Sequence, residues 1–201
     1  MARPKSFDVD DVLDRAVEVF WLNGMAATSI EDLVQALGIN RGSLYATFNS
    51  KEELYHRALD RYQDGFVVWL QELMAADGRP LRSRLRELLV AAASQDDNRG
   101  CFMMNTATER NSVDDECRAV TSRSVQSMLD ILGEAFAEAV ALDGPGNALA
   151  PGIDAQSART AVVTTLQGLR ALTTMTTDAV RPAPEPTIDL LLDTLFGTAA
   201  N

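Results

Sequence analysis

The stretch that decides the fold is residues 28–54, which read Thr-Ser-Ile-Glu-Asp-Leu-Val-Gln-Ala-Leu-Gly-Ile-Asn-Arg-Gly-Ser-Leu-Tyr-Ala-Thr-Phe-Asn-Ser-Lys-Glu-Glu-Leu. Apolar residues recur at helical spacing before a glycine, which favours a short helix that ends at Gly38. A second short helix follows from Arg41 to Phe48, and a third begins near Lys51. Two short helices joined by a tight turn are the layout of a helix-turn-helix, whose second helix lies in a DNA groove.

Capping residues mark where these helices begin. Thr28 followed by Glu31 fits a capping box at the first helix, and Ser50 followed by Glu53 fits one at the third. Asn40 is suited to cap the second helix. This layout leaves one face of the second helix available to a groove, and that face bears Arg41, Gly42, Ser43, Tyr45 and Ala46. The competing interpretation is a solvated helical hairpin in an ordinary bundle.

A family resemblance rests on two runs within this stretch. Gly-Ser-Leu-Tyr-Ala-Thr-Phe at 42–48, followed by Ser-Lys-Glu at 50–52, resembles the motif of the tetracycline-repressor (TetR) family of bacterial regulators. The resemblance implies a dimeric, all-helical repressor with an effector-binding C-terminal domain. Two positions depart from the usual pattern: Val34 stands where the family usually has alanine, and Asn40 replaces a serine or threonine cap.

The rest of the chain also has helical periodicity and no strand pattern. We expect an all-α fold of about nine helices, with breaks at 77–80, 143–152 and 181–186 where Gly, Pro and Asp gather. The expected organisation is a helix-turn-helix DNA-binding domain at 1–62 and a helical effector-binding and dimerisation domain at 63–201. The dimer would form through residues 155–177 and 187–197, which offer more apolar side chains than a monomer normally exposes.

Net charge argues against unspecific attraction to DNA. The chain carries a formal charge of -11, and residues 1–62 hold seven Lys and Arg against ten Asp and Glu. Basic residues nevertheless gather where the DNA face is expected. We therefore expect Thr28, Lys51 and the Arg3/Lys5 arm to hold the phosphate backbone or a minor groove, and Asn40 to lie near a phosphate.

Other functional classes find little support. The chain has no P-loop, no paired CxxC and no HExxH, so we expect no catalytic residue, metal or cofactor. The one histidine, His56, is expected to face solvent or a phosphate rather than to bind a metal. No apolar run approaches the roughly 20 residues that span a membrane, and no signal peptide is recognisable, so we expect a cytoplasmic protein with no membrane partner.

An apolar set rich in sulfur and aromatic rings is the candidate for effector binding. The resemblance places its segments around the family's ligand cavity, and methionine suits an adaptable pocket. The set comprises Phe66, Trp69, Phe102, Met103, Met104, Met128 and Met175, with Asn105, Thr108 and Gln167 as polar points. Ordinary core packing is the alternative for each residue. Cys101 and Cys117 are expected to be buried inert thiols rather than a redox switch.

These observations converge on a homodimeric repressor that binds a palindromic double-stranded DNA operator and is released by a small apolar molecule of unknown identity. A ligand-independent regulator or an activator is the alternative within the same family. A small helical enzyme or interaction module that retains a helix-turn-helix shape is the alternative from another class.

Overall fold

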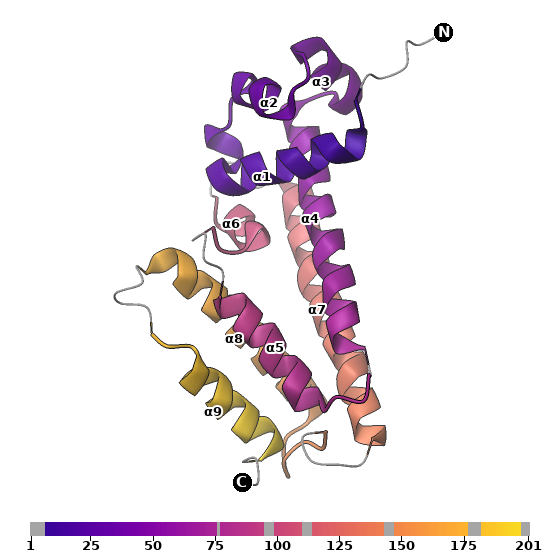
Figure 1. Cartoon of the computed structure of the whole chain (residues 1–201), viewed down its shortest axis with the longest axis vertical. Coiled ribbons are helices and arrows are strands. Elements are labelled where there is room, and N and C mark those ends of the chain that lie inside the picture. The colour runs from indigo at the N-terminus through magenta and orange to yellow at the C-terminus, as the bar shows by residue number, and fades with distance from the viewer. Residues whose placement is uncertain are drawn as a thin grey trace. The chain divides into compact units, whose positions relative to one another are not determined.

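The expected all-α class is confirmed. The computed structural model describes residues 7–75, 77–94, 99–109, 114–142, 147–176 and 182–197, and within these ranges the chain forms nine α-helices and no strand (Figure 1). The helices are α1 (Val9–Ala27), α2 (Ile30–Leu37), α3 (Arg41–Phe48), α4 (Lys51–Met74), α5 (Leu81–Ala93), α6 (Phe102–Thr108), α7 (Asp115–Ala141), α8 (Ala155–Met175) and α9 (Glu185–Phe196).

The chain divides into two compact units. The N-terminal unit comprises residues 1–65 and 102–123, and the C-terminal unit comprises residues 66–101 and 124–201. Both α4 and α7 therefore contribute residues to each unit. The N-terminal unit includes α6 and the start of α7, so it consists of two separate stretches of the sequence. A single domain boundary, such as the one expected after residue 62, does not describe this division.

Buried aromatic and aliphatic side chains hold the N-terminal unit together. α1 packs against α2 and α6, and α2 packs against α3. The Tyr55 ring of α4 is central, because it makes edge contacts with Phe20 and Phe102 at centroid distances of 4.9 and 5.7 Å. Its hydroxyl shares a 2.8 Å hydrogen bond with Thr106. Burial raises the pKa of Tyr55, so the ring serves as a neutral core residue.

The expected capping box at Thr28 and Glu31 is wrong by one residue. The Ser29 Oγ accepts the Asp32 N–H at 3.1 Å, and the Asp32 carboxylate accepts the Ser29 N–H at 2.9 Å. The Ser29 hydroxyl and backbone bonds hold the pKa of Asp32 below its usual value. Thr28 is buried, and its hydroxyl donates to the Gly24 carbonyl at 2.6 Å instead of capping α2.

The first helix continues beyond Gly24, although the Asn-Gly pair at 23–24 predicts a helix end. Gly24 has a non-helical backbone with φ 73° and ψ 170°, yet the helix resumes and continues to Ala27. A positive φ is readily adopted by glycine and costs other residues free energy. The result is a kink in α1, five residues before Ser29, the N-cap of α2.

The predicted turn of the helix-turn-helix is confirmed. Gly38 ends α2 in the left-handed conformation, with φ 67° and ψ 24°. Asn40 then caps α3, since its side-chain oxygen accepts the Ser43 N–H at 2.8 Å. The departure from a serine or threonine cap therefore keeps the capping function. Val34 is half-buried on α2.

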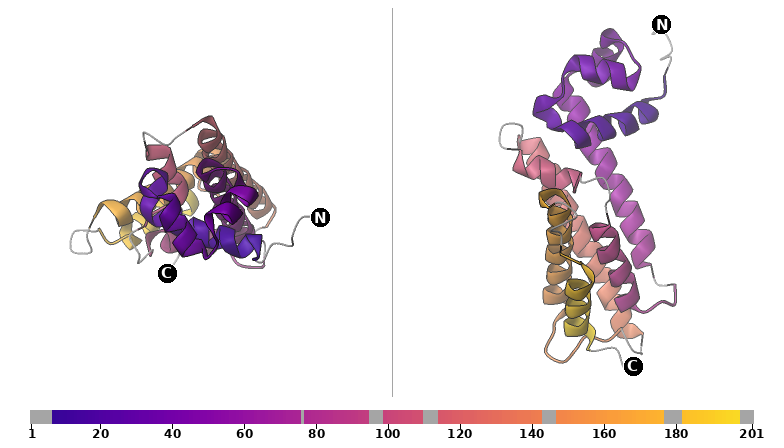
Figure 2. Two further views of the ribbon diagram at one scale, coloured as in Figure 1. Left: turned by 90° about the horizontal axis from the view of Figure 1, so that it is seen from above. Right: turned by 60° about the vertical axis from the view of Figure 1, so that its left-hand side comes forward.

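The C-terminal unit is built around α5, which packs against α8 and α9 (Figures 1 and 2). Its core draws leucine, alanine and aromatic side chains from α4, α5, α7, α8 and α9. Asp154 caps α8 by accepting the Ser157 N–H at 2.9 Å. Within the described ranges, no helix has the length and apolar character that a membrane span requires.

Candidate nucleic-acid interface

The helix α3 has one buried and one exposed face. Leu44 and Phe48 are fully buried, which fixes the helix on the N-terminal unit. Ser43 is half-buried, and the exposed positions are Asn40, Arg41, Gly42, Tyr45 and Ala46. The face that the sequence assigns to a groove is thus the face that the N-terminal unit leaves uncovered.

The exposed side chains on this face are held by weak contacts. Arg41 forms a 3.1 Å ion pair with Glu31, and both side chains are well exposed to solvent. The Arg41 guanidinium also lies 5.8 Å from the centroid of the Tyr45 ring. Exposed ion pairs of this kind contribute little stability, about 0–1 kcal/mol. A phosphate or a guanine can therefore replace Glu31 at small cost.

Glycine at position 42 leaves room for the cap of α3. A Cβ atom at Gly42 would lie 3.3 Å from the Asn40 Oδ1. That oxygen is the acceptor that holds the Ser43 N–H. A larger residue here would crowd the start of the helix that faces the groove.

Lys51, at the start of α4, ties three elements of the unit together. Its Nζ donates to the Met25 carbonyl and to the Thr28 carbonyl, both at 3.0 Å. Met25 lies just after the kink of α1, and Thr28 lies just before α2. An ammonium has three donors, so these two bonds leave one N–H of Lys51 for a further acceptor. We call residues 24–29, with the side chains bound to them, the α1–α2 junction.

Glu109 reaches the same junction from the residue after α6. Its carboxylate accepts the Met25 N–H at 3.3 Å and the Ala26 N–H at 2.9 Å. These backbone N–H groups follow Gly24, where the backbone of α1 is not helical. The carboxylate thus caps the last turn of α1, which explains why the helix resumes after the kink. Sequence reasoning missed this role, because the contact joins residues 83 and 84 positions apart.

Several acidic residues of the N-terminal unit pair with basic residues outside α3. Arg61 binds the Asp14 carboxylate at 2.8 and 3.0 Å, and Arg123 binds Asp60 at 3.1 Å. The Arg61 hydrogen bond holds the pKa of Asp14 below its usual value. Arg57, which sequence reasoning did not single out, lies 4.9 Å over the Phe48 ring. Arg3 and Lys5, the predicted arm, lie outside the described residues.

The predicted effector contacts fall into both units. Phe102, Met103, Met104, Asn105 and Thr108 belong to the N-terminal unit, and Phe66, Trp69, Met128, Gln167 and Met175 belong to the C-terminal unit. Phe102, Asn105 and Thr108 line a cavity of about 410 Å³ together with Phe20, Trp21 and Gly24 of α1. Met103 and Met128 are buried in the cores of their units, whereas Met175 is 78% exposed.

Polar groups are buried without partners in the C-terminal unit. The Gln167 Oε1 and the Arg170 Nε atoms on α8 have no hydrogen-bond partner. The Arg170 guanidinium lies 4.8 Å over the Phe66 ring, and its Nη1 lies 3.6 Å from the Cys101 Sγ. Unsatisfied buried groups are uncommon in native proteins and call for an explanation, such as a bound molecule.

His56 and the two cysteines are placed more specifically than the sequence indicates. The His56 Nε2 lies 2.9 Å from the Asp114 Oδ2, so the ring is paired with a carboxylate. Cys101 and Cys117 are both buried and form no disulfide. Burial and a hydrogen bond to Asp114 raise the pKa of the Cys117 thiol to about 12, which disfavours the reactive thiolate.

This geometry defines a helix-turn-helix DNA-binding protein, and comparisons with known proteins agree. Residues 12–58 match the model of the bacterial regulatory proteins, tetR family. The uncharacterised HTH-type transcriptional regulator YezE of Bacillus subtilis (strain 168) is 33% identical over 133 residues, which cover 65% of this chain and 69% of YezE. The chain belongs to the TetR family, a family of transcriptional regulators rather than enzymes.

Two further relatives extend the comparison. The HTH-type transcriptional repressor ComR of Escherichia coli (strain K12) is 41% identical over 110 residues, and the match spans 53% of this chain and about half of ComR, 52%. Among solved structures, the TetR family regulator CifR, as a cysteine mutant with 26 bp double-strand operator DNA, is 27% identical with a TM-score of 0.70. That match covers 94% of this chain and 98% of the CifR chain.

The Glu109 cap is testable by substitution. Replacing Glu109 with Ala removes a charged acceptor from two backbone N–H groups, so we expect a loss of about 1.5–3 kcal/mol in the free energy of unfolding. Hydrogen exchange at the Met25 and Ala26 amides should accelerate as well. Glu116→Ala is the matched control, because the contact of Glu116 within the described residues is an exposed one of 3.8 Å with Arg123. Unchanged exchange at both amides in Glu109→Ala would contradict the cap.

Proposed function

We propose that this chain is a cytoplasmic, dimeric repressor that binds a palindromic operator and releases it when a small, largely apolar molecule binds. The observation that carries the proposal is the exposed face of α3. The opposite face of this helix is buried, and the α1–α2 junction stabilises the surrounding unit. Family membership supports operator binding. The regulator CifR, 27% identical, is described in complex with its operator.

The proposed DNA contacts divide into two kinds. Arg41, Ser43 and Tyr45 contact base edges or adjacent phosphates, with Gly42 and Ala46 allowing close approach. Lys51, the Asn40 cap and the Arg3/Lys5 arm contact the phosphate backbone or a minor groove. Thr28, whose side chain is buried, acts from the α1–α2 junction by positioning Lys51 through its carbonyl.

Substitutions at Arg41 and Lys51 separate these two kinds of contact. Arg41→Ala should weaken binding to its own operator by about 1–3 kcal/mol if the side chain pairs with a guanine. Lys51→Ala should weaken binding to every DNA sequence and reduce the salt slope by about 1. Binding is measured by gel shift and salt titration on the DNA that flanks its own gene.

Arg79→Ala is the matched control for lost charge. Arg79 lies in the C-terminal unit and pairs with Asp77 and Glu87. Its substitution should leave operator affinity and salt slope unchanged. Wild-type affinity in both Arg41→Ala and Lys51→Ala would contradict the assigned DNA face.

The proposed dimer uses the outer faces of α8 and α9. Three large apolar side chains on these helices are exposed: Leu172, Met175 and, at 69%, Leu190. An open apolar groove of about 380 Å³ lies between α8 and the segment that precedes α9, lined in part by Leu169, Leu172 and Pro184. Two such helices from each chain would form a four-helix bundle about a two-fold axis.

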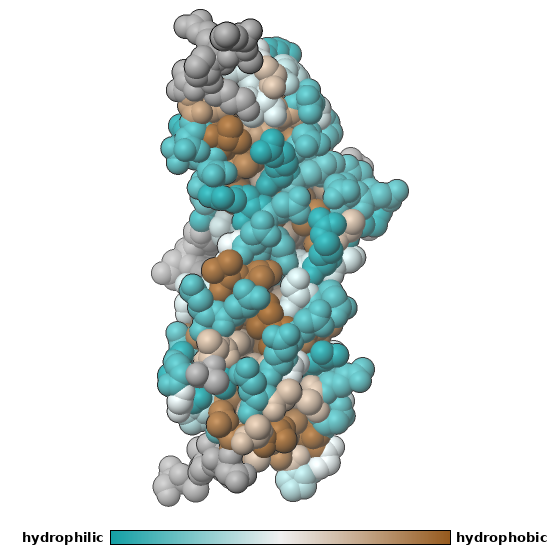
Figure 3. Space-filling model, turned by 90° about the vertical axis from the view of Figure 1, so that its right-hand side faces the viewer, coloured by the Kyte–Doolittle hydropathy of each residue, from teal (hydrophilic) through white to brown (hydrophobic). Residues whose placement is uncertain are grey.

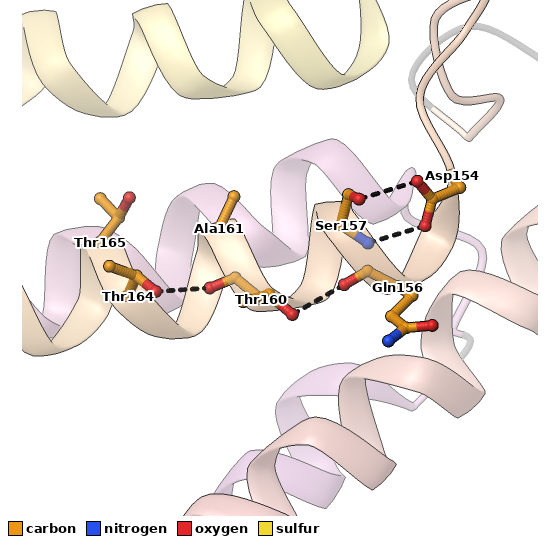
Figure 4. A pocket seen from close by; sticks show the side chains of 7 residues that line it. All are labelled: Asp154, Gln156, Ser157, Thr160, Ala161, Thr164 and Thr165. Atoms are coloured by element: carbon orange, nitrogen blue, oxygen red, sulfur yellow. Dashed lines mark hydrogen bonds between the residues drawn. The ribbon is translucent and has the colours of Figure 1, made fainter.

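Small side chains on α8 suit close approach by a second chain (Figure 4). The Thr160 hydroxyl donates to the Gln156 carbonyl and the Thr164 hydroxyl to the Thr160 carbonyl, both at 2.8 Å. Their polar atoms are thus already satisfied within α8, and their methyl groups remain available for packing. Burying this face in a dimer leaves few polar groups without partners. Such a dimer would place two α3 helices in successive major grooves about 34–36 Å apart, which calls for a palindromic operator.

An exposed leucine tests the dimer without disturbing the core. Leu192, a natural choice from the sequence, is fully buried in its own unit, so Leu190→Glu is the informative change. We expect Leu190→Glu to sediment as a 21.8 kDa monomer and to bind the operator more weakly. Leu142→Glu, at another exposed leucine outside α8 and α9, is the control and should stay dimeric. A wild-type chain that sediments as a monomer at micromolar concentration would contradict the dimer.

The proposed effector site lies in the C-terminal unit near Phe66 and Trp69. Their rings lie 5.7 Å apart, and Phe66 contacts Arg170. The partnerless Gln167 Oε1 and Arg170 Nε atoms supply one acceptor and one donor for a bound molecule. These contacts fit an apolar body that carries a polar group. Binding of such a molecule lowers operator affinity if it favours a state of the dimer in which the separation of the two N-terminal units no longer equals the spacing of the operator half-sites.

Trp69 provides the readout for this effector. In a Trp21→Phe background, compounds that change Trp69 emission should weaken operator binding by about 5–150-fold, the usual range of allosteric coupling. Gln167→Leu should weaken binding of the same compounds and leave operator affinity without them unchanged. Compounds that change Trp69 emission yet leave operator affinity intact would contradict effector control.

A further inference from the structure

Three side chains of types that bind metals meet in the N-terminal unit, and none of them is among the residues assigned to DNA or to the effector. They are His56 on α4, Asp114 just before α7 and Cys117 in the first turn of α7. Their ligand atoms all lie within 4.8 Å of one another. His56 and Asp114 are 58 positions apart in the sequence, so the cluster does not form a recognisable metal-binding motif in the sequence.

The chemistry of the three donors is specific. An imidazole nitrogen, a thiolate and a carboxylate oxygen are all ligands of Zn²⁺, at about 2.0–2.3 Å from the ion. Ligand atoms around one tetrahedral ion are therefore separated by about 3–4 Å. Here they lie within 4.8 Å of one another, so small side-chain adjustments bring them to that spacing. We propose that His56, Asp114 and Cys117 form a site for one Zn²⁺-like transition-metal ion.

Exposure of the three side chains fits an ion that enters from solvent. Cys117 is fully buried, the His56 side chain is 17% exposed, and the Asp114 side chain is 48% exposed. The buried thiol and imidazole form the inner wall, and the carboxylate lies on the open side. A fourth ligand, water or a small anion, can approach from that side, as in sites with three protein ligands.

The two oxygens of Asp114 separate its capping role from metal binding. Oδ1 accepts the Cys117 N–H at 2.8 Å and thereby caps α7. Oδ2 lies 2.9 Å from the His56 Nε2. The cap of α7 and the hydrogen bond to His56 account for the position of Asp114, and the Cys117 thiol adds a third potential ligand at the same point. Metal bound at Oδ2 keeps the cap and replaces the thiol proton, which leaves to solvent.

An ion at this site ties α4 to the start of α7. His56 follows Lys51 on α4 by little more than one helical turn. Metal bound there stabilises the N-terminal unit by an amount that grows with the logarithm of the free metal concentration once that concentration exceeds Kd. The site thus offers a metal-dependent clamp on the helix that begins at the α1–α2 junction.

The test is metal binding to the full chain without DNA, so that its outcome is independent of operator binding. Zn²⁺ is titrated against a chromophoric chelator, and Co²⁺ is used as a spectroscopic probe of sulfur ligation. We expect one ion per chain, a thiolate-to-Co²⁺ charge-transfer band in the near ultraviolet, and a raised melting temperature with Zn²⁺. Circular dichroism confirms that each variant is folded.

Four substitutions separate the ligands from the background. Cys117→Ser should abolish the charge-transfer band, and His56→Gln should weaken Zn²⁺ binding by more than about 100-fold, beyond the loss typical of residues outside the ligand set. Asp114→Asn retains a capping side chain and should also weaken binding. Cys101→Ser, at the buried cysteine of the C-terminal unit, should bind as the wild type does. A band that survives in Cys117→Ser, or Zn²⁺ affinity unaffected by His56→Gln, would overturn the site.

Discussion

The arrangement of the N-terminal unit depends on the hydrogen bonds made by the Lys51 ammonium. It binds the carbonyls of Met25 and Thr28 and so joins the start of α4 to the end of α1 and the start of α2. The Glu109 carboxylate, whose charge is opposite to that of Lys51, accepts hydrogen bonds from the neighbouring N–H groups of Met25 and Ala26. A cation on carbonyls and an anion on amides complement the local backbone dipoles, which makes both sets of bonds stronger than neutral ones. The position of α3 follows from this junction through the short turn after α2.

The pairing of acidic residues outside α3 bears on the conflict between a net charge of -11 and a role in DNA binding. Several acids of the N-terminal unit are engaged in local bonds: Asp14 with Arg61, Asp60 with Arg123 and Asp32 with Ser29. Arg41, in contrast, is held by an exposed pair with Glu31 and by the Tyr45 ring. Electrostatic attraction to a polyanion acts over about 8–10 Å at physiological salt, so the local arrangement at α3 matters more than the total charge.

Sequence reasoning succeeded where the determining contacts are local. The Gly38 turn, the Asn40 cap and the buried Leu44 and Phe48 all depend on residues within one or two helical turns, and each was predictable. The α2 cap was misplaced by one position, because Thr28 and Ser29 carry the same hydroxyl chemistry. Only the bond of Thr28 to Gly24 shows which hydroxyl remains for the helix.

Contacts between distant parts of the chain were not predictable from spacing. Glu109 at the α1 kink, His56 beside Asp114 and Arg170 against Phe66 each join residues from separate elements. Sequence also favoured a set of effector residues by composition, and the structure divides this set between two units. Apolar composition identifies core-forming segments, but it cannot tell which of them share a cavity.

The central claim is that α3, held by the α1–α2 junction, is the surface that binds operator DNA. Hydrogen exchange of the full chain tests it most directly, with and without an operator selected from random duplex DNA. The account predicts slower exchange on DNA binding within residues 25–29 and 41–54, with α5 unaffected. Slower exchange confined to the C-terminal unit, or operator binding that leaves residues 41–54 unprotected, would contradict it.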